Sequence, residues 1–311
     1  MKNAKKTRTT DEILMGSSRK RRAFEVFNYL LLTFMGVISL LPVWHILMKS
    51  FSAPESVEAG LVKLLPVNFS TFSYEFILQK KEFYTAFFVS VKRVLLGVPL
   101  QLLCTILAAY PLSKEDSQLY GRRWYVTLFI ITMVFSGGMI PTYMVVSSLH
   151  LVNTRTVLVV MGTVTVYNMI IAKTFFQNSL PEELFEAAEL DGCGIGKFFF
   201  KIAVPCSKAI IAVIALYVGV SQWNSYFTAM IYVTDQKIYP LQLVLRDILI
   251  LGQQLTQITD PAEIEALVER QKVAQIIKYV VIIVSSLPVI CVYPFLQKYF
   301  VKGVMIGSVK G

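Results

Sequence analysis

Long stretches without charged side chains recur along the whole of this 311-residue sequence. A helix that crosses the hydrocarbon core of a bilayer needs about 20 apolar residues, and six stretches meet or approach that length. They are Val26–Met48, Val94–Leu112, Trp124–Arg155, Thr156–Ala172, Ala209–Thr234 and Tyr279–Gln297. Only 16% of the residues are charged, against roughly 25% in an ordinary soluble domain. One such stretch could be a buried soluble helix, but six together predict an all-α polytopic membrane protein with six transmembrane helices.

The third stretch is too long for a single helix. Gly137-Gly138 and Pro141 interrupt it, so its helix is predicted to end near Phe135. Residues Ser136–Thr154 are then expected to form a loop that folds back toward the membrane.

Basic residues border two of the other stretches. The fourth stretch is the shortest, and it depends on Arg155 and Lys173 reaching the membrane interface with their long side chains. Phe83–Val91 is predicted to be an interfacial helix that leads into the second stretch. Lys92 and Arg93, just before the second stretch, would then not need to be buried.

Lysine and arginine are concentrated in alternate connecting segments, which predicts cytoplasmic N- and C-termini and explains most of the net charge of +10. Residues 1–23 form a basic arm suited to anionic lipid rather than to nucleic acid. Residues 24–297 form the membrane domain, and 298–311 a cytoplasmic tail. The first stretch is longer than a cleaved signal and Ser50–Ala53 is a poor cleavage site, so it is expected to remain attached. Asp260–Glu263 predicts a short helix before the last stretch.

The sequence offers little from which a metal site or a disulfide could be built. Its two histidines, His45 and His150, are far apart. The four cysteines have no paired spacing and lie mostly in apolar runs, so they are expected to be small buried hydrophobic residues. They are Cys104, Cys193, Cys206 and Cys291.

The loop at residues 177–206, between the fourth and fifth stretches, carries the most specific pattern. Ser179 and Glu182 have the spacing of a capping box, with Pro181 in the first turn. Gly192 is expected to end this helix in a turn that needs positive φ. The alanines Ala187 and Ala188 leave a face with little side-chain bulk. An ordinary amphipathic connector would share these features.

The loop also resembles a known motif. Glu186-Ala187-Ala188, Gly192, Ile202 and Val204-Pro205 are similar at each spacing to the EAA loop of binding-protein-dependent ABC importers, with Val204 in place of leucine. The resemblance implies a type I importer permease fold and a coupling helix that docks into a cleft of an ATPase subunit. The residues implied in that contact are Glu186, Ala187, Ala188, Asp191, Gly192 and Pro205.

The same loop contains no nucleotide site. A phosphate-binding loop would need glycine where Asp191 stands and serine or threonine where Phe198 stands. The chain is therefore expected to have no cofactor and no catalytic residue of its own, with ATP and Mg bound by partner ATPase subunits.

The C-terminal sequence, Gln297–Gly311, has glycines at 303, 307 and 311. It resembles the tail of the smaller permease subunit of maltose-type carbohydrate importers, in the branch that handles complex oligosaccharides. The resemblance implies a tail that contacts the ATPase subunits through Gly303, Gly307, Lys310 and Gly311. Ala109–Ser113, Gly138–Tyr143 and Trp223–Phe227 are similar to the same branch.

Neutral polar and aromatic side chains on the fourth and fifth stretches suit a sugar, which binds through aromatic faces and hydroxyl-bonding groups. The candidates are Tyr167, Asn168, Gln222, Trp223, Asn224 and Tyr226, and Ser221 lies among them in the sequence. The same side chains could instead hold helices together. No acidic or basic residue is expected deep in a span, which disfavours an ion-coupled carrier.

The leading hypothesis is therefore a non-catalytic permease subunit in the bacterial cell membrane, importing a sugar or oligosaccharide by alternating access. Its expected partners are a second homologous permease subunit, two ATPase subunits, an external solute-binding protein, the carbohydrate and membrane lipids, with no nucleic acid. An importer for peptides or polyamines remains open as an alternative. An ion-coupled secondary transporter and a polytopic membrane enzyme are less well supported, since neither embedded carboxylates nor a catalytic cluster is visible.

Overall fold

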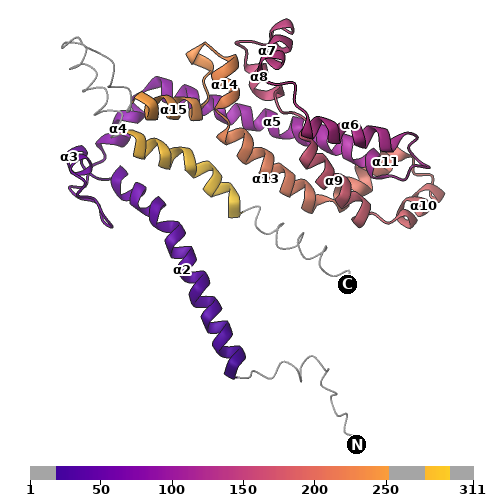
Figure 1. Cartoon of the computed structure of the whole chain (residues 1–311), viewed down its shortest axis with the longest axis horizontal. Coiled ribbons are helices and arrows are strands. Elements are labelled where there is room, and N and C mark those ends of the chain that lie inside the picture. The colour runs from indigo at the N-terminus through magenta and orange to yellow at the C-terminus, as the bar shows by residue number, and fades with distance from the viewer. Residues whose placement is uncertain (1–18, 252–276, 295–311) are drawn as a thin grey trace, which may run out of the picture. The chain divides into compact units, whose positions relative to one another are not determined.

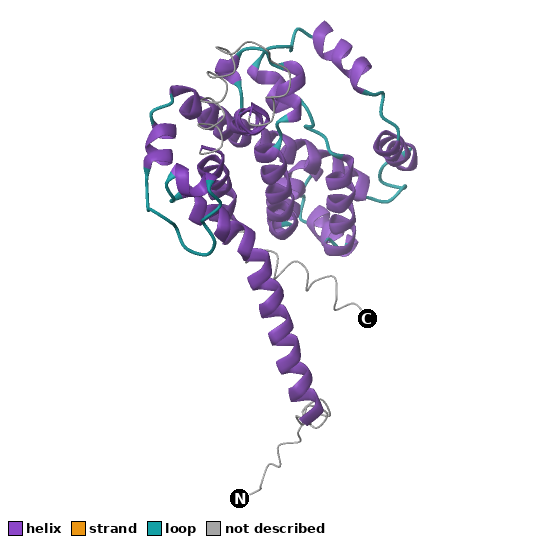
Figure 2. Cartoon of the chain, turned by 60° about the vertical axis from the view of Figure 1, so that its left-hand side comes forward, coloured by secondary structure: helices purple, strands orange, loops and turns teal. Residues whose placement is uncertain are grey.

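A computed structural model describes residues 19–251 and 277–294 of the chain. Within these ranges the regular elements are helices joined by loops (Figure 2), and the one β-type contact is an isolated bridge between Ser52 and Phe69. The chain divides into two compact units, residues 1–71 and 72–311. The all-helical class predicted from the sequence is confirmed for the described residues.

The first unit contains α2 (Arg19–Ser50), a long helix that covers the first predicted span, and the short α3 (Pro54–Glu58). Hydrophobic side chains lie all around α2 and are exposed, which suits a helix surrounded by lipid or by other helices. Two hydrogen-bonding groups near its end are held by the loop that follows. Trp44 Nε1 donates to the Leu64 carbonyl at 2.9 Å, and His45 Nδ1 lies 2.8 Å from the Lys63 carbonyl oxygen.

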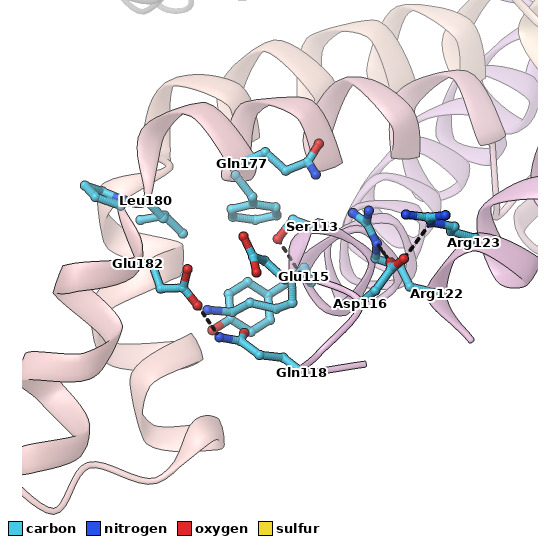
Figure 3. A pocket seen from close by; sticks show the side chains of 13 residues that line it. Ser113, Glu115, Asp116, Gln118, Arg122, Arg123, Gln177, Leu180 and Glu182 are labelled. Atoms are coloured by element: carbon cyan, nitrogen blue, oxygen red, sulfur yellow. Dashed lines mark hydrogen bonds and ion pairs between the residues drawn. The ribbon is translucent and has the colours of Figure 1, made fainter. Parts of the chain in front are cut away.

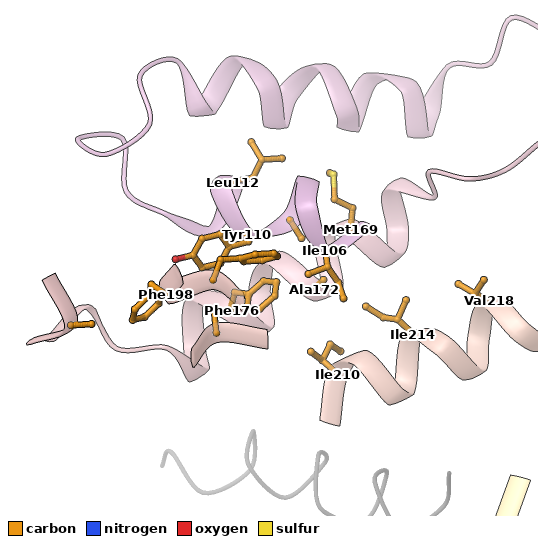
Figure 4. Close-up of a cluster of buried hydrophobic side chains, with 14 residues drawn as sticks. Ile106, Tyr110, Leu112, Met169, Ala172, Phe176, Phe198, Ile210, Ile214 and Val218 are labelled. Atoms are coloured by element: carbon orange, nitrogen blue, oxygen red, sulfur yellow. The ribbon is translucent and has the colours of Figure 1, made fainter. Parts of the chain in front are cut away.

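The second unit is organised around α5 (Lys81–Ser113), which follows the short α4 (Phe72–Leu78). Helices α9 (Val166–Ser179) and α13 (Lys208–Asn224) pack along it (Figure 1). Apolar side chains from all three helices form the main buried cluster (Figure 4), and they include Tyr110, Met169, Phe176, Ile214 and Val218. Helix α5 is thus the element to which the rest of this unit is attached.

Two helix pairs bend sharply at short breaks. Helix α6 (Arg122–Val134) and helix α7 (Met139–Ser148) meet at 113°, at Gly138 with φ +84°. The predicted end near Phe135 is confirmed, since Phe135 follows the last residue of α6. The predicted loop at Ser136–Thr154 is wrong, because α7 occupies most of it. The glycines turned the chain, but Met139–Ser148 had enough apolar residues to form a second helix.

The second bent pair lies at the start of the fifth predicted span. Residues Ile195–Cys206, which comprise the short helices α11, η1 and α12, meet α13 at 77°. Helix α13 ends at Asn224, and α14 (Phe227–Tyr232) follows after a break, so the prediction of one helix over Ala209–Thr234 is wrong.

The fourth predicted span, Thr156–Ala172, is also divided. Helix α8 (Arg155–Val160) and helix α9 are separated by a turn that contains Gly162 at φ +79°. A left-handed glycine cannot continue an α-helix, which is why the apolar run does not form one rod. The chain continues through η2 (Gln236–Ile238) and α15 (Leu241–Leu251).

Among the described residues, three helices are long and apolar enough to cross a membrane: Arg21–Ser50, Lys81–Ser113 and Ile277–Pro294. The number rises to five if each bent pair is one span. The chain is therefore a helical membrane protein, but the predicted count of six is not confirmed. The predicted helix at Asp260–Glu263 and the C-terminal tail lie outside the described residues.

The prediction that all four cysteines are buried is wrong for two of them. Cys104 and Cys193 are half-buried, whereas Cys206 and Cys291 are exposed in the isolated chain. Apolar sequence context indicates a lipid-facing or interface position as readily as a core position, and the sequence pattern alone does not separate these.

Candidate functional site

The 177–206 loop folds into a short helix with a defined end. Helix α10 (Glu182–Leu190) is followed by Asp191 and then by Gly192 at φ +75°. The Gly192 amide donates to the Glu189 carbonyl at 2.9 Å, and the Cys193 amide donates to the Ala188 carbonyl at 2.8 Å. This pair of bonds is a Schellman motif, which satisfies the last carbonyls of a helix and requires a left-handed residue. The prediction that Gly192 ends this helix in a turn of positive φ is confirmed.

The start of α10 differs from the prediction. Ser179 is the last residue of α9, and Pro181 occupies the N-cap position without a side-chain cap. The predicted capping box is therefore wrong. Glu182 instead accepts a hydrogen bond of 2.6 Å from Gln118 Nε2, in the loop that follows α5 (Figure 3). The carboxylate still lies in the first turn, where the helix dipole favours it.

The two alanines of the motif point to different environments. Ala188 is buried in the main cluster, close to 9% exposed, whereas Ala187 is exposed. Glu183, Glu186 and Leu190 are also exposed, Leu190 to 90% of its surface. Helix α10 therefore offers an outer face that combines carboxylates with an unburied leucine, and the sequence reasoning had missed Leu190.

Lys114 connects α10 to the end of α5. Its Nζ atom lies 4.1 Å from the centre of the Phe185 ring, 5.4 Å from Tyr110 and 5.6 Å from Phe198. These distances are within the range of cation–π attraction. Burial among these groups lowers the pKa of Lys114, and the Glu182 carboxylate acts in the opposite direction. One ammonium group thus contacts α5, α10 and α11 (Ile195–Phe198) together.

Beside this contact lies a cavity of about 470 Å³ (Figure 3). Asp116 forms ion pairs across its rim, with Arg122 Nε at 2.8 Å and Arg123 Nε at 2.6 Å. The hydrogen bond from Arg122 is the main cause that holds the pKa of Asp116 below its usual value. The lining mixes acidic and basic side chains, and it has no histidine or cysteine that would indicate a metal site.

The remaining residues of the predicted coupling motif lie along the return path to α13. Asp191 is the C-cap of α10, and Pro205 is exposed in the three-residue helix α12 (Val204–Cys206). Between α11 and α12 the chain forms one π-helical turn, η1 (Phe199–Ala203). Phe198 and Ala203 bury this segment against the main cluster.

A buried cation lies toward the opposite end of α5. Arg93 is only 3% exposed, and it donates from Nε to Gln222 Oε1 at 2.9 Å and from Nη1 to the Ser225 carbonyl at 2.7 Å. The prediction of a separate interfacial helix at Phe83–Val91 is wrong, because α5 runs through this segment without a break. The expectation that Arg93 need not be buried is wrong as well, whereas Lys92 is exposed as expected.

Comparison with known proteins identifies the family. The model of the "binding-protein-dependent transport system inner membrane component" family matches residues 78–306. This chain belongs to that family. It is a non-catalytic permease subunit of a binding-protein-dependent importer, and such permeases work with solute-binding proteins and with ATPases that hydrolyse ATP.

Two curated relatives of this permease come from Bacillus subtilis (strain 168). Protein LplC is 39% identical over 297 residues, covering 96% of this chain and 98% of the relative. The polygalacturonan/rhamnogalacturonan transport system permease protein YtcP is 39% identical over 292 residues, covering 94% and 100%. A solved bacterial ABC transporter involved in import of the acidic polysaccharide alginate is 30% identical with a TM-score of 0.78, covering 91% and 99%.

The structure separates the predicted sugar-binding residues of the permease into two groups. Gln222 and Trp223 are buried in contacts within the chain, since Gln222 accepts from Arg93 and Trp223 Nε1 donates to the Ser285 carbonyl at 2.8 Å. Asn168 is buried as well. The other three are exposed: Tyr167 at 58%, Tyr226 at 40%, and Asn224.

Two residues near Asn224 belong to the same exposed surface, and of these Tyr217 was not singled out from the sequence. Tyr217 and Ser221 lie on α13 at helical spacing before Asn224, and both are exposed. Residues at i, i+4 and i+7 share one face of a helix. Their spacing was visible in the sequence, but which face of α13 remains unpacked was not.

Proposed function

We propose that this permease moves a carbohydrate across the bacterial cell membrane, and that its coupling to ATP runs through α10. The observation that carries the proposal is the exposed acidic face of α10, closed by the Schellman motif at Gly192. The names of YtcP and of the alginate importer support a carbohydrate as the substrate of this chain too.

In this proposal α10 docks into a cleft of an ATPase subunit. Glu186, Ala187 and Asp191 are exposed and available for the contact, and Leu190 adds an apolar anchor. Ala188 is buried and does not contact the ATPase, but its small side chain lets α10 pack closely on the main cluster. Lys114 then passes a displacement of α10 to α5, because the ammonium group contacts rings on both helices.

The assembly proposed is a pair of homologous permease subunits above two ATPases, with α10 and both chain termini on the cytoplasmic side. ATP binding draws the coupling helices together and opens the pathway to a loaded binding protein, and hydrolysis resets it. Tyr167, Asn224 and Tyr226 are proposed to line the pathway, together with Ser221 and Tyr217. Their exposed hydroxyl, amide and aromatic groups suit a neutral sugar ring and its hydroxyls.

The test is uptake by the complete complex in proteoliposomes, with its binding protein outside and ATP inside. We expect uptake of an oligosaccharide that stops when ATP is withheld. Uptake of a peptide or a polyamine in place of sugars would contradict the carbohydrate assignment. Uptake driven by a sodium or proton gradient without ATP would contradict the importer mechanism.

The C-terminal tail is a separate part of the proposal. Gly303, Gly307, Lys310 and Gly311 lie outside the described residues, so the support is the sequence resemblance alone. A tail of nine residues can reach about 30 Å when extended, enough to touch an ATPase beneath the membrane. Deleting 303–311 should lower coupled ATPase activity while insertion is preserved. Wild-type coupling in the truncated complex would assign the tail no role.

A further inference from the structure

A second basic cluster lies on α5, away from α10. Lys92 and Arg93 of α5 and Arg155 at the start of α8 line one cavity of about 440 Å³. The remaining lining side chains are apolar or carry a hydroxyl, such as Phe88 and Thr85, and none is a carboxylate. The volume is within the range of small-molecule sites, which is roughly 300–1,000 Å³.

Among the residues that the structure describes, no carboxylate offsets the positive charge of this cavity. Within the described ranges, no ion pair includes Lys92, Arg93 or Arg155. The two acceptors of Arg93, the Gln222 amide and the Ser225 carbonyl, are neutral. The carbonyl belongs to the C-terminal end of α13, whose dipole offsets part of one charge and makes the buried arginine tolerable. This dipole does not offset the charges of Lys92 and Arg155.

Two exposed basic residues near a membrane interface could simply extend their side chains into water. That explanation accounts for Lys92 or Arg155 taken singly. It does not account for the buried Arg93, nor for three cations that converge from two helices on one partly apolar hollow. A bound anion explains the convergence, because its charge offsets theirs in surroundings of low dielectric constant.

We propose that this cavity is a subsite for a carboxylate, and that the carbohydrate moved by this permease is an acidic, uronate-containing oligosaccharide. The inference rests on the proposed function, which supplies the carbohydrate. Lys92 and Arg155 pair with the carboxylate, the Phe88 ring offers a face for the sugar, and Arg93 positions the α5 side of the site through its bonds to the end of α13.

The location of the cavity agrees with this role. About 30 Å of helix separates Arg93 from Ser113, the end of α5 that α10 adjoins. With α10 on the cytoplasmic side, the cavity lies toward the external side, where a sugar leaves its binding protein. A carboxylate or phosphate of a lipid headgroup has the same chemistry and could reach this depth, so the experiment must separate the two sources.

The decisive measurement is uptake of a galacturonate trisaccharide and of the neutral galactose trisaccharide by the complete complex in proteoliposomes. In the double variant Lys92→Gln, Arg155→Gln we expect uptake of the uronate at low concentration to fall about tenfold, mainly through KM, because a charge-assisted contact is lost. The single variant Lys92→Arg, with Arg155 unchanged, keeps a cation at this position and should retain most of the uptake. The matched control, Lys81→Gln with Lys237→Gln, removes two exposed charges outside the cavity and should retain wild-type uptake.

Each outcome bears on a different statement. An equal effect of the double variant on both sugars, or no effect on either, overturns the carboxylate subsite. A third outcome is that wild-type uptake of both sugars depends on the phosphatidylglycerol content of the vesicles, whereas uptake by the double variant does not. This result assigns the cavity to lipid and overturns the carboxylate subsite too. If the wild-type complex takes up the neutral sugar but not the uronate, this inference is refuted and the proposed function still holds. ATP-driven uptake of neither sugar refutes the proposed function itself.

Discussion

The two ends of α5 are held by contacts of different kinds. At the Ser113 end, Lys114 lies against aromatic rings and a surface hydrogen bond joins Gln118 to Glu182. At the Lys81 end the bonds are buried and join segments far apart in sequence, as between Arg93 and Gln222, or between the Leu241 amide and Ser90 Oγ at 2.8 Å. The first set can adjust when a docked surface moves, whereas the second fixes the helices in one arrangement.

The largest expected effect is at the fixed end. In Arg93→Met the buried amide of Gln222 and the half-buried carbonyl of Ser225 lose their donor, which should cost about 3 kcal/mol of stability. We expect a lower unfolding temperature of the purified complex, measured by the loss of its gel-filtration peak after heating.

Lys92→Met is the matched control, since Lys92 is the exposed neighbour of Arg93 on the same helix. It removes the same charge without uncovering buried acceptors. If both variants unfold at the same temperature, the buried bonds do not fix this end of α5, and the contrast between the two ends is lost.

The two ends also differ in how well sequence predicted them. The helix at Glu182–Leu190 and its end at Gly192 depend on residues within one short segment, so local rules were sufficient. The bond of Arg93 to Gln222 joins residues more than 120 positions apart, and only the folded chain brings them together. The same reason explains why the burial of Arg93, next to the exposed Lys92, was not predicted.

Helix breaks were the other source of error. Gly137-Gly138 correctly predicted a turn. Gly162 and the break at Ser225, however, lie inside apolar runs that composition alone predicts to be single helices. The capping box failed for a different reason. Glu182 found its donor in Gln118, a residue from another loop, and α9 continued through Ser179. Tertiary contacts decided these positions against the local pattern.

The next effect concerns the adjustable end. Gly192→Ala places a Cβ at φ +75°, where L-residues cost about 1 kcal/mol or more, although no atom lies within 4 Å of the added carbon. We expect the end of α10 to reorganise, so that sugar transported per ATP hydrolysed falls about fivefold. Gly192→Asp should act in the same direction, with an added charge at the docking face.

A matched glycine lies two positions on. Gly194 has φ −66° and open space around its Cα, so Gly194→Ala should behave as the wild type. Gly192→Asn should be milder than Gly192→Ala, because asparagine tolerates the left-handed region. Equal coupling in the two alanine variants would show that the Schellman turn does not matter for docking.

A smaller effect is expected from the contact between α10 and α5. Lys114→Met keeps an unbranched chain among the rings of Tyr110, Phe185 and Phe198 but removes the charge that attracts them. We expect the ratio of uptake to ATP hydrolysis to fall about threefold, with the amount of assembled complex unchanged. Lys114→Arg should keep the ratio of uptake to ATP hydrolysis near the wild-type value, since a guanidinium also stacks on aromatic faces. A fall in assembled complex with a normal ratio would make the contact merely structural.

The smallest effect is expected at Asp116, whose ion pairs lie at the surface. The hydrogen bond from Arg122 lowers the pKa of this carboxyl group in the folded chain below its ordinary value of about 3.9. A lowered pKa means that the pairing stabilises the fold at every pH above the unfolded value and is lost as pH falls through the folded value. The unfolding temperatures of wild type and Asp116→Asn should therefore differ by a small, constant amount from pH 8 to pH 5 and converge below about pH 4. Glu115→Gln, at an exposed neighbour that takes no part in the ion pairs of Asp116 with Arg122 and Arg123, is the matched control. A difference that changes between pH 7 and pH 5 would mean that another group titrates with this loop, and that the adjustable end of α5 is sensitive to proton concentration.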